Sequence, residues 1–340
     1  MENSKKKKVL VIGPEFFGYY LSVEKAFKQL GYTTQSVSYI TQVENKWERI
    51  VYHFSGDKEA FFEKKRRVFN NKVLSLYKEF RPDIVFIIQG SEIYSETVEK
   101  MKEAKKILWM MDSIFRNKRG YALRKIVDYI FVFERTDVNK LLENENIVSH
   151  FLPLALDEAV YYPYTNRKDE IDILFVGALY DNRVVLLERI YQEFKDYNMK
   201  VYGHYYSPFR RPLYHFFRRN KNVFLNKNIS PAFVNELYNR SKICINIHHN
   251  QNKYGVNQRF FEISGSKSFQ LVDRNGYITE NFDSDEIATY NSEDELIEII
   301  RSVLHGQINT KAFAEKAHKK VLTNHTFRRR MEYVMALVND

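Results

Sequence analysis

The chain has 340 residues, of which 44% are hydrophobic and 28% are charged. These proportions are typical of a packed globular protein and exclude a fibrous repeat or a wholly disordered chain. The length exceeds what one hydrophobic core usually holds, so we expect two domains. The 53 basic and 43 acidic side chains leave a net charge of +10, which favours anionic partners such as nucleotides, acidic membranes or nucleic acid.

The first half alternates short apolar runs with polar helical stretches. Residues 9–12 predict a strand, and a glycine-bearing loop and a helix follow it. The loop glycines, Gly13 and Gly18, fit neither the dinucleotide fingerprint nor the P-loop, so we expect no standard NAD or ATP site. They can serve a tight turn or the approach of a substrate. Residues 33–40 can form the next strand. Later apolar runs predict buried parallel strands at 83–88, 106–111 and 128–133, and one or two helices are expected within 47–80.

The second half repeats this alternation after two prolines, Pro153 and Pro163. We therefore expect an α/β protein of two facing Rossmann-like domains with a ligand in the cleft between them. Residues 1–157 would form the first domain and residues 158–322 the second. Residues 323–340 would form a terminal helix that packs back on the first domain.

The single cysteine, Cys244, excludes an internal disulfide and suits a reducing compartment, and its apolar surroundings favour buried packing over a nucleophile. No apolar run approaches the ~18–20 residues that a membrane-spanning helix needs. The basic N-terminal stretch precedes only a short apolar run, which is unlike a signal peptide. These features predict a cytoplasmic protein.

The sequence FVGALYDNR contains the second glycine turn, at Gly177, and places Arg183 near the start of the next helix. A helix N-terminus already favours an anion, so a diphosphate would fit there. The alternative is a solvated arginine paired with Asp181 or Glu188.

The densest group of polar residues is YGVNQRFFEISGS, from Tyr254 to Ser266. Asn257 can cap the helix that begins there, and Arg259 and Glu262 lie on one face of it. An arginine in a first turn opposes the helix dipole, which indicates an anionic partner. That partner can be Glu262 itself. Alternatively, Arg259 faces a phosphate while Glu262 accepts hydrogen bonds from ribose hydroxyls.

Asp112, His248 and His249 are further candidates for a chemical role. Asp112 ends a predicted strand, where it could accept a proton, orient a sugar or cap the next helix. His248 and His249 are adjacent on a predicted strand and have no third ligand at a suitable spacing, so we expect no metal site.

The segment 204–224 interleaves basic residues with aromatic ones. It can be a packed insertion with solvated arginines, a contact with an anionic membrane or a lipid-linked acceptor, or a nucleic-acid surface. We favour the first two and expect no nucleic-acid partner. The arginines in question are Arg210, Arg211, Arg218 and Arg219.

Several segments taken together resemble the spore-maturation CgeB-like family of glycosyltransferases, which belongs to the GT-B class. In the second half they are FVGALYDNR, INIHHNQNKYGVNQRFFEISGS, SFQLVD, EIATYNSEDELIEII and NHTFRRR. In the first half, LWMMDS, DYIFVFERTD and FLPLALDEAVYYP are similar to the same family. The resemblance covers most of the chain and is strongest from Asp172 to Arg330.

This resemblance implies an enzyme that transfers a sugar from a nucleoside-diphosphate donor, in particular a UDP sugar, to a hydroxyl on a glycan, protein or lipid-linked carrier. It implies no cofactor and no metal. The first domain would bind the acceptor and the second the donor. The implied residues are Gly13 and Gly18 on the acceptor side, Gly177, Arg183, Asn257, Arg259 and Glu262 on the donor side, and Asp112 and Arg259 in catalysis.

The sequence departs from the related families at two positions. Glu262 falls where retaining GT-B transferases place the second glutamate of their E-x7-E motif, but the first would fall at Tyr254. Lys267 stands where the family usually has a glycine, and we expect it to be a surface substitution. The retaining mechanism is therefore not carried over as a whole. The alternatives are a non-catalytic binder of sugar nucleotides and a basic nucleic-acid-binding protein.

Overall fold

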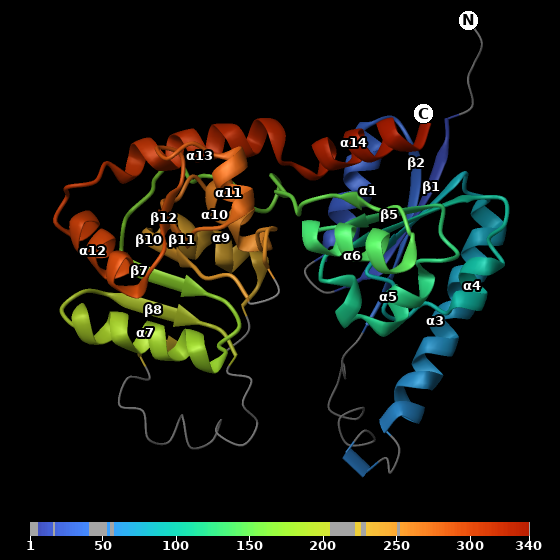
Figure 1. Cartoon of the computed structure of the whole chain (residues 1–340), viewed down its shortest axis with the longest axis horizontal. Helices are drawn as coiled ribbons and strands as arrows, with labels where there is room; N and C mark the ends of the chain where they lie inside the picture. The colour runs from blue at the N-terminus through green and yellow to red at the C-terminus, as the bar shows by residue number, and fades with distance from the viewer. Residues whose placement is uncertain are drawn as a thin grey trace, which may run out of the picture. The chain divides into compact units, whose positions relative to one another are not determined.

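The computed structural model describes residues 6–15, 18–40, 53–54, 58–204, 222–225, 229–249 and 252–339. The chain divides into two compact units (Figure 1). Unit 1 comprises Met1–Leu154 together with Phe327–Asp340, and unit 2 comprises Ala155–Thr326. The boundaries expected after residue 157 and before residue 323 lie close to this division.

Unit 1 is built on a parallel six-stranded sheet in the order β2-β1-β3-β4-β5-β6. Its central strands are buried on both faces, which explains why they appear in the sequence as continuous apolar runs. The strand order reverses between β1 and β3, which makes this pair a topological switch point. The strands are β1 (Lys8–Pro14), β2 (Thr33–Tyr39), β3 (Ile84–Ile88), β4 (Lys105–Met110), β5 (Tyr129–Val132) and β6 (His150–Phe151).

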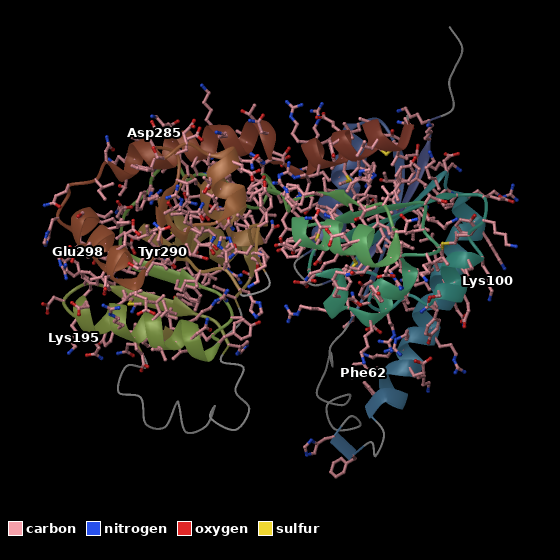
Figure 2. All side chains as sticks on the ribbon, viewed as in Figure 1. Phe62, Lys100, Lys195, Asp285, Tyr290 and Glu298 are labelled. Carbon is pink, nitrogen blue, oxygen red and sulfur yellow. The ribbon has the colours of Figure 1, made fainter. Side chains whose placement is uncertain are left out.

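Helices cover this sheet, and side chains fill the space between them and the strands (Figure 2). A helix was expected within 47–80, and α3 occupies the last part of that range. Most of residues 47–57 lie outside the described part of the chain. The helices of unit 1 are α1 (Tyr19–Gln29), α3 (Lys58–Phe80), α4 (Ser95–Glu99), the 3-10 helix η2 (Ile114–Arg116), α5 (Lys118–Leu123), α6 (Arg135–Glu145) and α14 (Phe327–Asn339).

Unit 2 has a second parallel six-stranded sheet, in the order β12-β11-β10-β7-β8-β9. The chain starts at β7 in the middle, builds β8 and β9 on one side, and then returns to place β10 to β12 on the other. The switch point of this sheet therefore lies between β7 and β10. The strands are β7 (Ile171–Val176), β8 (Met199–Tyr202), β9 (Phe224–Leu225), β10 (Ser241–Asn246), β11 (Gln270–Asp273) and β12 (Ala288–Tyr290).

Local sequence signals account for the ends of several helices in unit 2. Ser230 caps α9 by accepting a hydrogen bond from the backbone N–H of Phe233 at 3.3 Å, and Pro231 occupies the first helical position. The chain from Glu293 onward forms α12, α13 and α14, of which the first two belong to this unit. The helices are α7 (Asp181–Glu193), α9 (Pro231–Asn239), α10 (Gln258–Gly265), α11 (Gly276–Asn281), α12 (Glu293–Leu304) and α13 (Thr310–Asn324).

Two expectations concern reactivity and membranes. Cys244 is buried in β10, and burial raises the pKa of its thiol to about 12, which agrees with a packing role. Within the described ranges, none of the helices combines the length and the apolar character needed to cross a bilayer. The basic residues Arg210, Arg211, Arg218 and Arg219 lie outside the described residues.

The terminal helix α14 is part of unit 1. The ring of Phe327 packs against Tyr19 of α1 and Trp109 of β4, with centroid distances of 6.1 and 6.0 Å. Arg330 is buried and its Nε donates to the carbonyl oxygens of Pro153, at 2.9 Å, and Leu154, at 3.2 Å. The guanidinium therefore holds α14 to the end of the first segment of the unit.

Replacing Arg330 with alanine should lower the free energy of unfolding by about 3 kcal/mol, because buried carbonyls lose a charged donor. The adjacent Arg329 provides a matched control, since its side chain is exposed and pairs with Glu332 on the same helix. Arg329→Ala should cost about 0.5 kcal/mol. Urea titrations followed by tryptophan fluorescence measure both changes, and equal effects would contradict the role of Arg330.

Candidate functional site

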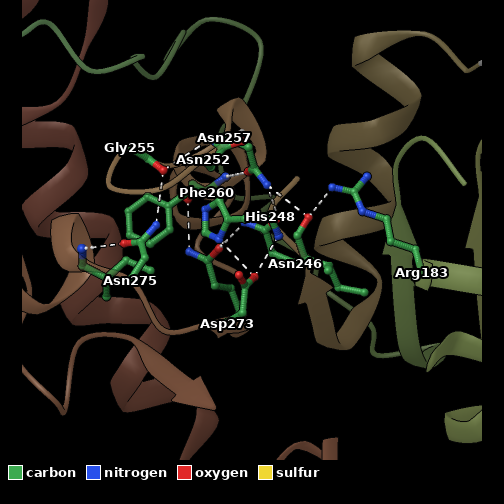
Figure 3. Close-up of polar contacts among 12 residues, drawn as sticks. Arg183, Asn246, His248, Asn252, Gly255, Asn257, Phe260, Asp273 and Asn275 are labelled. Carbon is green, nitrogen blue, oxygen red and sulfur yellow. Dashed lines mark hydrogen bonds and ion pairs between the residues drawn. The ribbon is translucent and has the colours of Figure 1, made fainter. Parts of the chain in front are cut away.

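The predicted donor residues of unit 2 gather at the carboxyl ends of β7 and β10. Gly177 directly follows β7, and Arg183 is in the first turn of α7. Asn257 and Arg259 belong to the start of α10, which the loop after β10 leads into. Because these two strands are neighbours at the switch point, residues far apart in the sequence lie together here (Figure 3).

Arg183 is the most deeply buried cation of this group, with 6% of its surface exposed. Its Nη1 donates to the carbonyl oxygen of Ala178 at 3.0 Å, and its Nη2 donates to that of Ile247 at 2.6 Å. Burial, with a further contribution from nearby Arg259, lowers the pKa of Arg183 to about 10. The alternative of a solvated arginine paired with Asp181 or Glu188 is therefore wrong. The guanidinium instead joins the loops after β7 and β10.

Arg259 is the second residue of α10 and is half-buried. It makes no hydrogen bond or ion pair with any residue that the structure describes. Its Cζ lies against Gly177, where an added Cβ would be 3.5 Å away. An added Cβ at Gly177 would meet the ring of Phe175 at 3.0 Å and would only touch this guanidinium. Arg183 and Arg259 thus lie in the first turns of two different helices, α7 and α10, and interact electrostatically; two cations at helix N-termini favour an anion.

Asn257 caps α10 as predicted, because its Oδ1 accepts a hydrogen bond from the backbone N–H of Phe260 at 3.2 Å. Its Nδ2 donates to Oδ1 of Asn246, the last residue of β10, at 2.7 Å. Both ends of the amide are thus engaged within the protein. Asn257 fixes the start of α10 relative to β10 and thereby positions Arg259.

Glu262 lies one turn after Arg259 and is 6% exposed. The expected alternative, in which it pairs with Arg259, is not observed, since Arg259 has no such bond among the described residues. Both side chains act electrostatically on Tyr238, whose buried hydroxyl has no hydrogen-bond partner in the described part of the chain. Glu262 and Arg259 act on this hydroxyl in opposite directions, since Glu262 raises the pKa of Tyr238 and Arg259 lowers it.

The two departures from the related families have structural explanations. The hydroxyl of Tyr254 donates to Oε2 of Glu280 at 2.5 Å, so this position supplies a link to α11 instead of a carboxylate. Lys267 has φ 54°, a conformation in which glycine is less strained. It follows α10 at the opposite end from Arg259 and forms an ion pair with Glu315. Its surface role agrees with the prediction.

One pair of residues was missed by the sequence analysis. Asp273 Oδ1, at the end of β11, accepts hydrogen bonds from the backbone N–H of His248 at 2.8 Å and from its Nδ1 at 3.0 Å. The sequence predicts that His248 and His249 lie on a strand, but β10 ends at Asn246 and both lie in the loop beyond it. In the described part of the chain, no three or more His, Cys, Asp or Glu residues form a group that could hold a metal ion.

The predicted acceptor-side residues lie in unit 1. Gly13 is near the end of β1, where an added Cβ would contact Tyr20 at 3.0 Å, and Gly18 begins α1 with φ 70°. Asp112 follows β4 and is exposed, and its Oδ2 accepts a hydrogen bond from Nε2 of Gln89 at 3.1 Å.

Asp112 does not cap the helix that follows it. The backbone N–H of Ile114 in η2 instead donates to Oδ2 of Asp137 at 3.0 Å. The capping alternative considered for Asp112 is therefore wrong.

Comparison with known proteins agrees with this geometry. Residues 183–336 match the model of a protein family described as Glycosyl transferase-like. No curated protein sequence matches the chain. Solved structures of GT-B glycosyltransferases are similar over nearly the whole length, and the fold of this chain is GT-B.

Three of these structures show how far the similarity extends. HepE from Anabaena, solved with UDP and glucose, has a TM-score of 0.67 and 9% identity, covering 98% of this chain and 99% of that one. Sucrose-phosphate synthase from Thermosynechococcus elongatus has a TM-score of 0.66 and 9% identity, with the same coverage. The UDP-forming trehalose-phosphate synthase from Burkholderia vietnamiensis has a TM-score of 0.66 and 12% identity, covering 98% and 100%.

Gly203, at the end of β8, should be essential for the shape of this site. An added Cβ would lie 1.7 Å from the carbonyl oxygen of Gly177, so Gly203→Ala must displace the loop against which Arg259 rests. We expect a loss of about 3 kcal/mol in the free energy of unfolding. It should also weaken binding of inorganic pyrophosphate, measured by calorimetry.

Gly306→Ala is the matched control. Gly306 has φ 74° but nothing within 4 Å of an added Cβ, so only backbone strain of about 1–2 kcal/mol is expected. Pyrophosphate affinity should be unchanged in this variant. If both alanine variants bound pyrophosphate like the wild type, the contact between Gly203 and Gly177 would have no bearing on the anion site.

Proposed function

We propose that the protein is a CgeB-like glycosyltransferase that moves a sugar from a UDP-linked donor to a hydroxyl group of an acceptor. The observation that carries this proposal is the pair of adjoining arginines at the switch point of unit 2. Arg183 is buried and bonded only to carbonyl oxygens, and Arg259 has no bonding partner among the described residues. Two nearby cations, neither of which is hydrogen-bonded to a carboxylate among the described residues, indicate an anionic ligand.

A diphosphate matches this charge better than a single carboxylate. Arginine presents several donors in a plane and binds phosphate oxygens in pairs. In the proposed complex, Arg259 contacts the diphosphate directly. Arg183 supplies positive potential from behind it and holds the two loops in place. Both charges are fixed before the ligand arrives, so little reorganisation is needed.

The proposed transfer breaks the bond between the sugar's anomeric carbon and the diphosphate oxygen and forms a bond from that carbon to the acceptor oxygen. Negative charge grows on the leaving diphosphate, and the two guanidinium groups stabilise it in the role that a divalent metal has in other transferases. Asp112 of unit 1 is proposed to take the proton from the acceptor hydroxyl. Its bond from Gln89 would orient the carboxylate for this task.

Glu262 is proposed to recognise the nucleoside. An ionised carboxylate offers only acceptors, which suits the two hydroxyls of a ribose. Its position one turn from Arg259 places it beside the proposed diphosphate site. The structures of HepE, one of which was solved with UDP-glucose, support the choice of a UDP-linked donor.

Nucleotide binding is the first test. UDP or UDP-glucose at 100 times its dissociation constant should stabilise the protein by about 2.7 kcal/mol, seen as a rise in melting temperature. GDP and dTDP serve as comparison ligands. Release of UDP in the presence of an acceptor then establishes transfer. Steep salt-dependent binding of RNA, with no stabilisation by any nucleotide, would contradict the proposal.

Substitutions test the individual roles. Arg259→Ala should weaken binding of UDP and of pyrophosphate at least about tenfold, because a charge-assisted hydrogen bond contributes about 1.5–3 kcal/mol. Arg301→Ala is the control, since Arg301 is an exposed residue of α12 that pairs with Glu298. Glu262→Ala should weaken UDP binding but leave pyrophosphate binding unchanged. Wild-type affinities in Arg259→Ala and Glu262→Ala would refute both assignments.

A further inference from the structure

Two buried polar groups next to Arg183 have no hydrogen-bond partner among the described residues. They are Nε2 of His248, in the loop after β10, and the hydroxyl of Tyr290, at the end of β12. The two residues are 7% and 6% exposed, respectively. An unpaired buried polar atom costs about 1–3 kcal/mol, so two of them in one place indicate a ligand that pairs with them.

The pairing of His248 defines what its free nitrogen can do. Asp273 accepts from both the backbone N–H and Nδ1 of His248, so Nδ1 carries the proton. The bond to His248 lowers the pKa of Asp273 even though its burial acts in the opposite direction, which keeps the carboxylate ionised. In the neutral ring, Nε2 is then a hydrogen-bond acceptor that points away from Asp273. Its natural partner is a hydroxyl group.

Tyr290 belongs to the same cluster. Asp273 and Tyr290 are neighbours in the register of β11 and β12, and Arg183 interacts electrostatically with both of them. Burial raises the pKa of Tyr290 far above its usual value, so its hydroxyl stays protonated and can donate. One acceptor, His248 Nε2, and one donor, the hydroxyl of Tyr290, therefore border the buried arginine.

Electrostatic interactions link the polar groups of unit 2. Glu262 and Arg259 both act on Tyr238, Arg259 acts on Arg183, and Asp273 and Tyr290 also act on Arg183. A nucleotide sugar presents three kinds of chemical group, which are ribose, diphosphate and sugar. The carboxylate matches the ribose, the cations match the diphosphate, and the neutral donor and acceptor remain for the sugar.

We propose that His248, held by Asp273, and Tyr290 form the pocket for the transferred sugar and hydrogen-bond its hydroxyl groups. This inference rests on the proposed function. It assigns recognition of the sugar to the β11 and β12 side of the sheet, where the sequence motifs gave no indication of a ligand. Asp273 acts as a positioning residue, because it orients the imidazole and fixes which nitrogen is free.

The test is His248→Asn, measured by calorimetry with UDP and with UDP-glucose. The asparagine amide can still donate to Asp273 from the Nδ1 position, but nothing replaces Nε2. Affinity for UDP-glucose should fall about tenfold, the equivalent of one hydrogen bond of about 1.4 kcal/mol, while affinity for UDP stays unchanged. Tyr290→Phe, which removes only the hydroxyl, should give the same contrast. UDP distinguishes a sugar contact from a ribose contact, because it lacks only the sugar.

His318→Asn is the control variant. His318 is on α13, and its Nδ1 lies 3.2 Å from the carbonyl oxygen of Ser264, near the far end of α10 from Arg259. It should bind both ligands like the wild type. Equal losses for UDP and UDP-glucose in His248→Asn would overturn the sugar assignment, as would unchanged affinity for both. If the wild type bound neither ligand, the proposed function would fail as well, which separates the two conclusions.

Discussion

The buried guanidinium of Arg183 is the contact on which the proposed donor site depends. It joins the loop after β7 to the loop after β10 through two carbonyl oxygens. A cation at such depth is costly, and the cost is offset here by hydrogen bonds to two carbonyl oxygens and by the charge of Asp273 nearby. The arrangement holds the two loops together and leaves positive potential beside Arg259. Arg183 therefore contributes both to the structure of this region and to the proposed chemistry.

Topology explains why the polar residues meet where they do. Unit 2 starts in the middle of its sheet and extends first to one side and then to the other, so the chain leaves β7 and β10 toward opposite sides of the sheet while the ends of these two strands stay adjacent. Asn257 then ties α10 to the last residue of β10. In unit 1, Gly13 and the residues after β3 lie at the equivalent position, which is the carboxyl ends of the neighbouring strands β1 and β3.

Much of the fold followed from patterns within single segments. The apolar runs located most strands, and Asn257 marked the start of α10, because these signals act over a few residues. The contacts of Arg183 could not be predicted in this way, since its partner Ile247 is distant in the sequence. The contact between His248 and Asp273 could not be predicted either, because these two residues are also distant in the sequence. Strand β10 ends at Asn246, earlier than predicted. The carbonyl oxygen of the next residue, Ile247, accepts a hydrogen bond from Arg183 instead of from a neighbouring strand.

The connection between the two units has a consequence for protein engineering. The chain leaves unit 1 after Leu154 and returns at Phe327, so unit 2 is one uninterrupted insertion. Next to these crossings, Leu156 and Thr326 form a parallel bridge, and the N–H of Leu156 donates to the carbonyl of His325 at 2.8 Å. The two splice points are therefore adjacent, and exchanging residues 155–326 as a cassette between homologues would show whether this unit carries the proposed donor site.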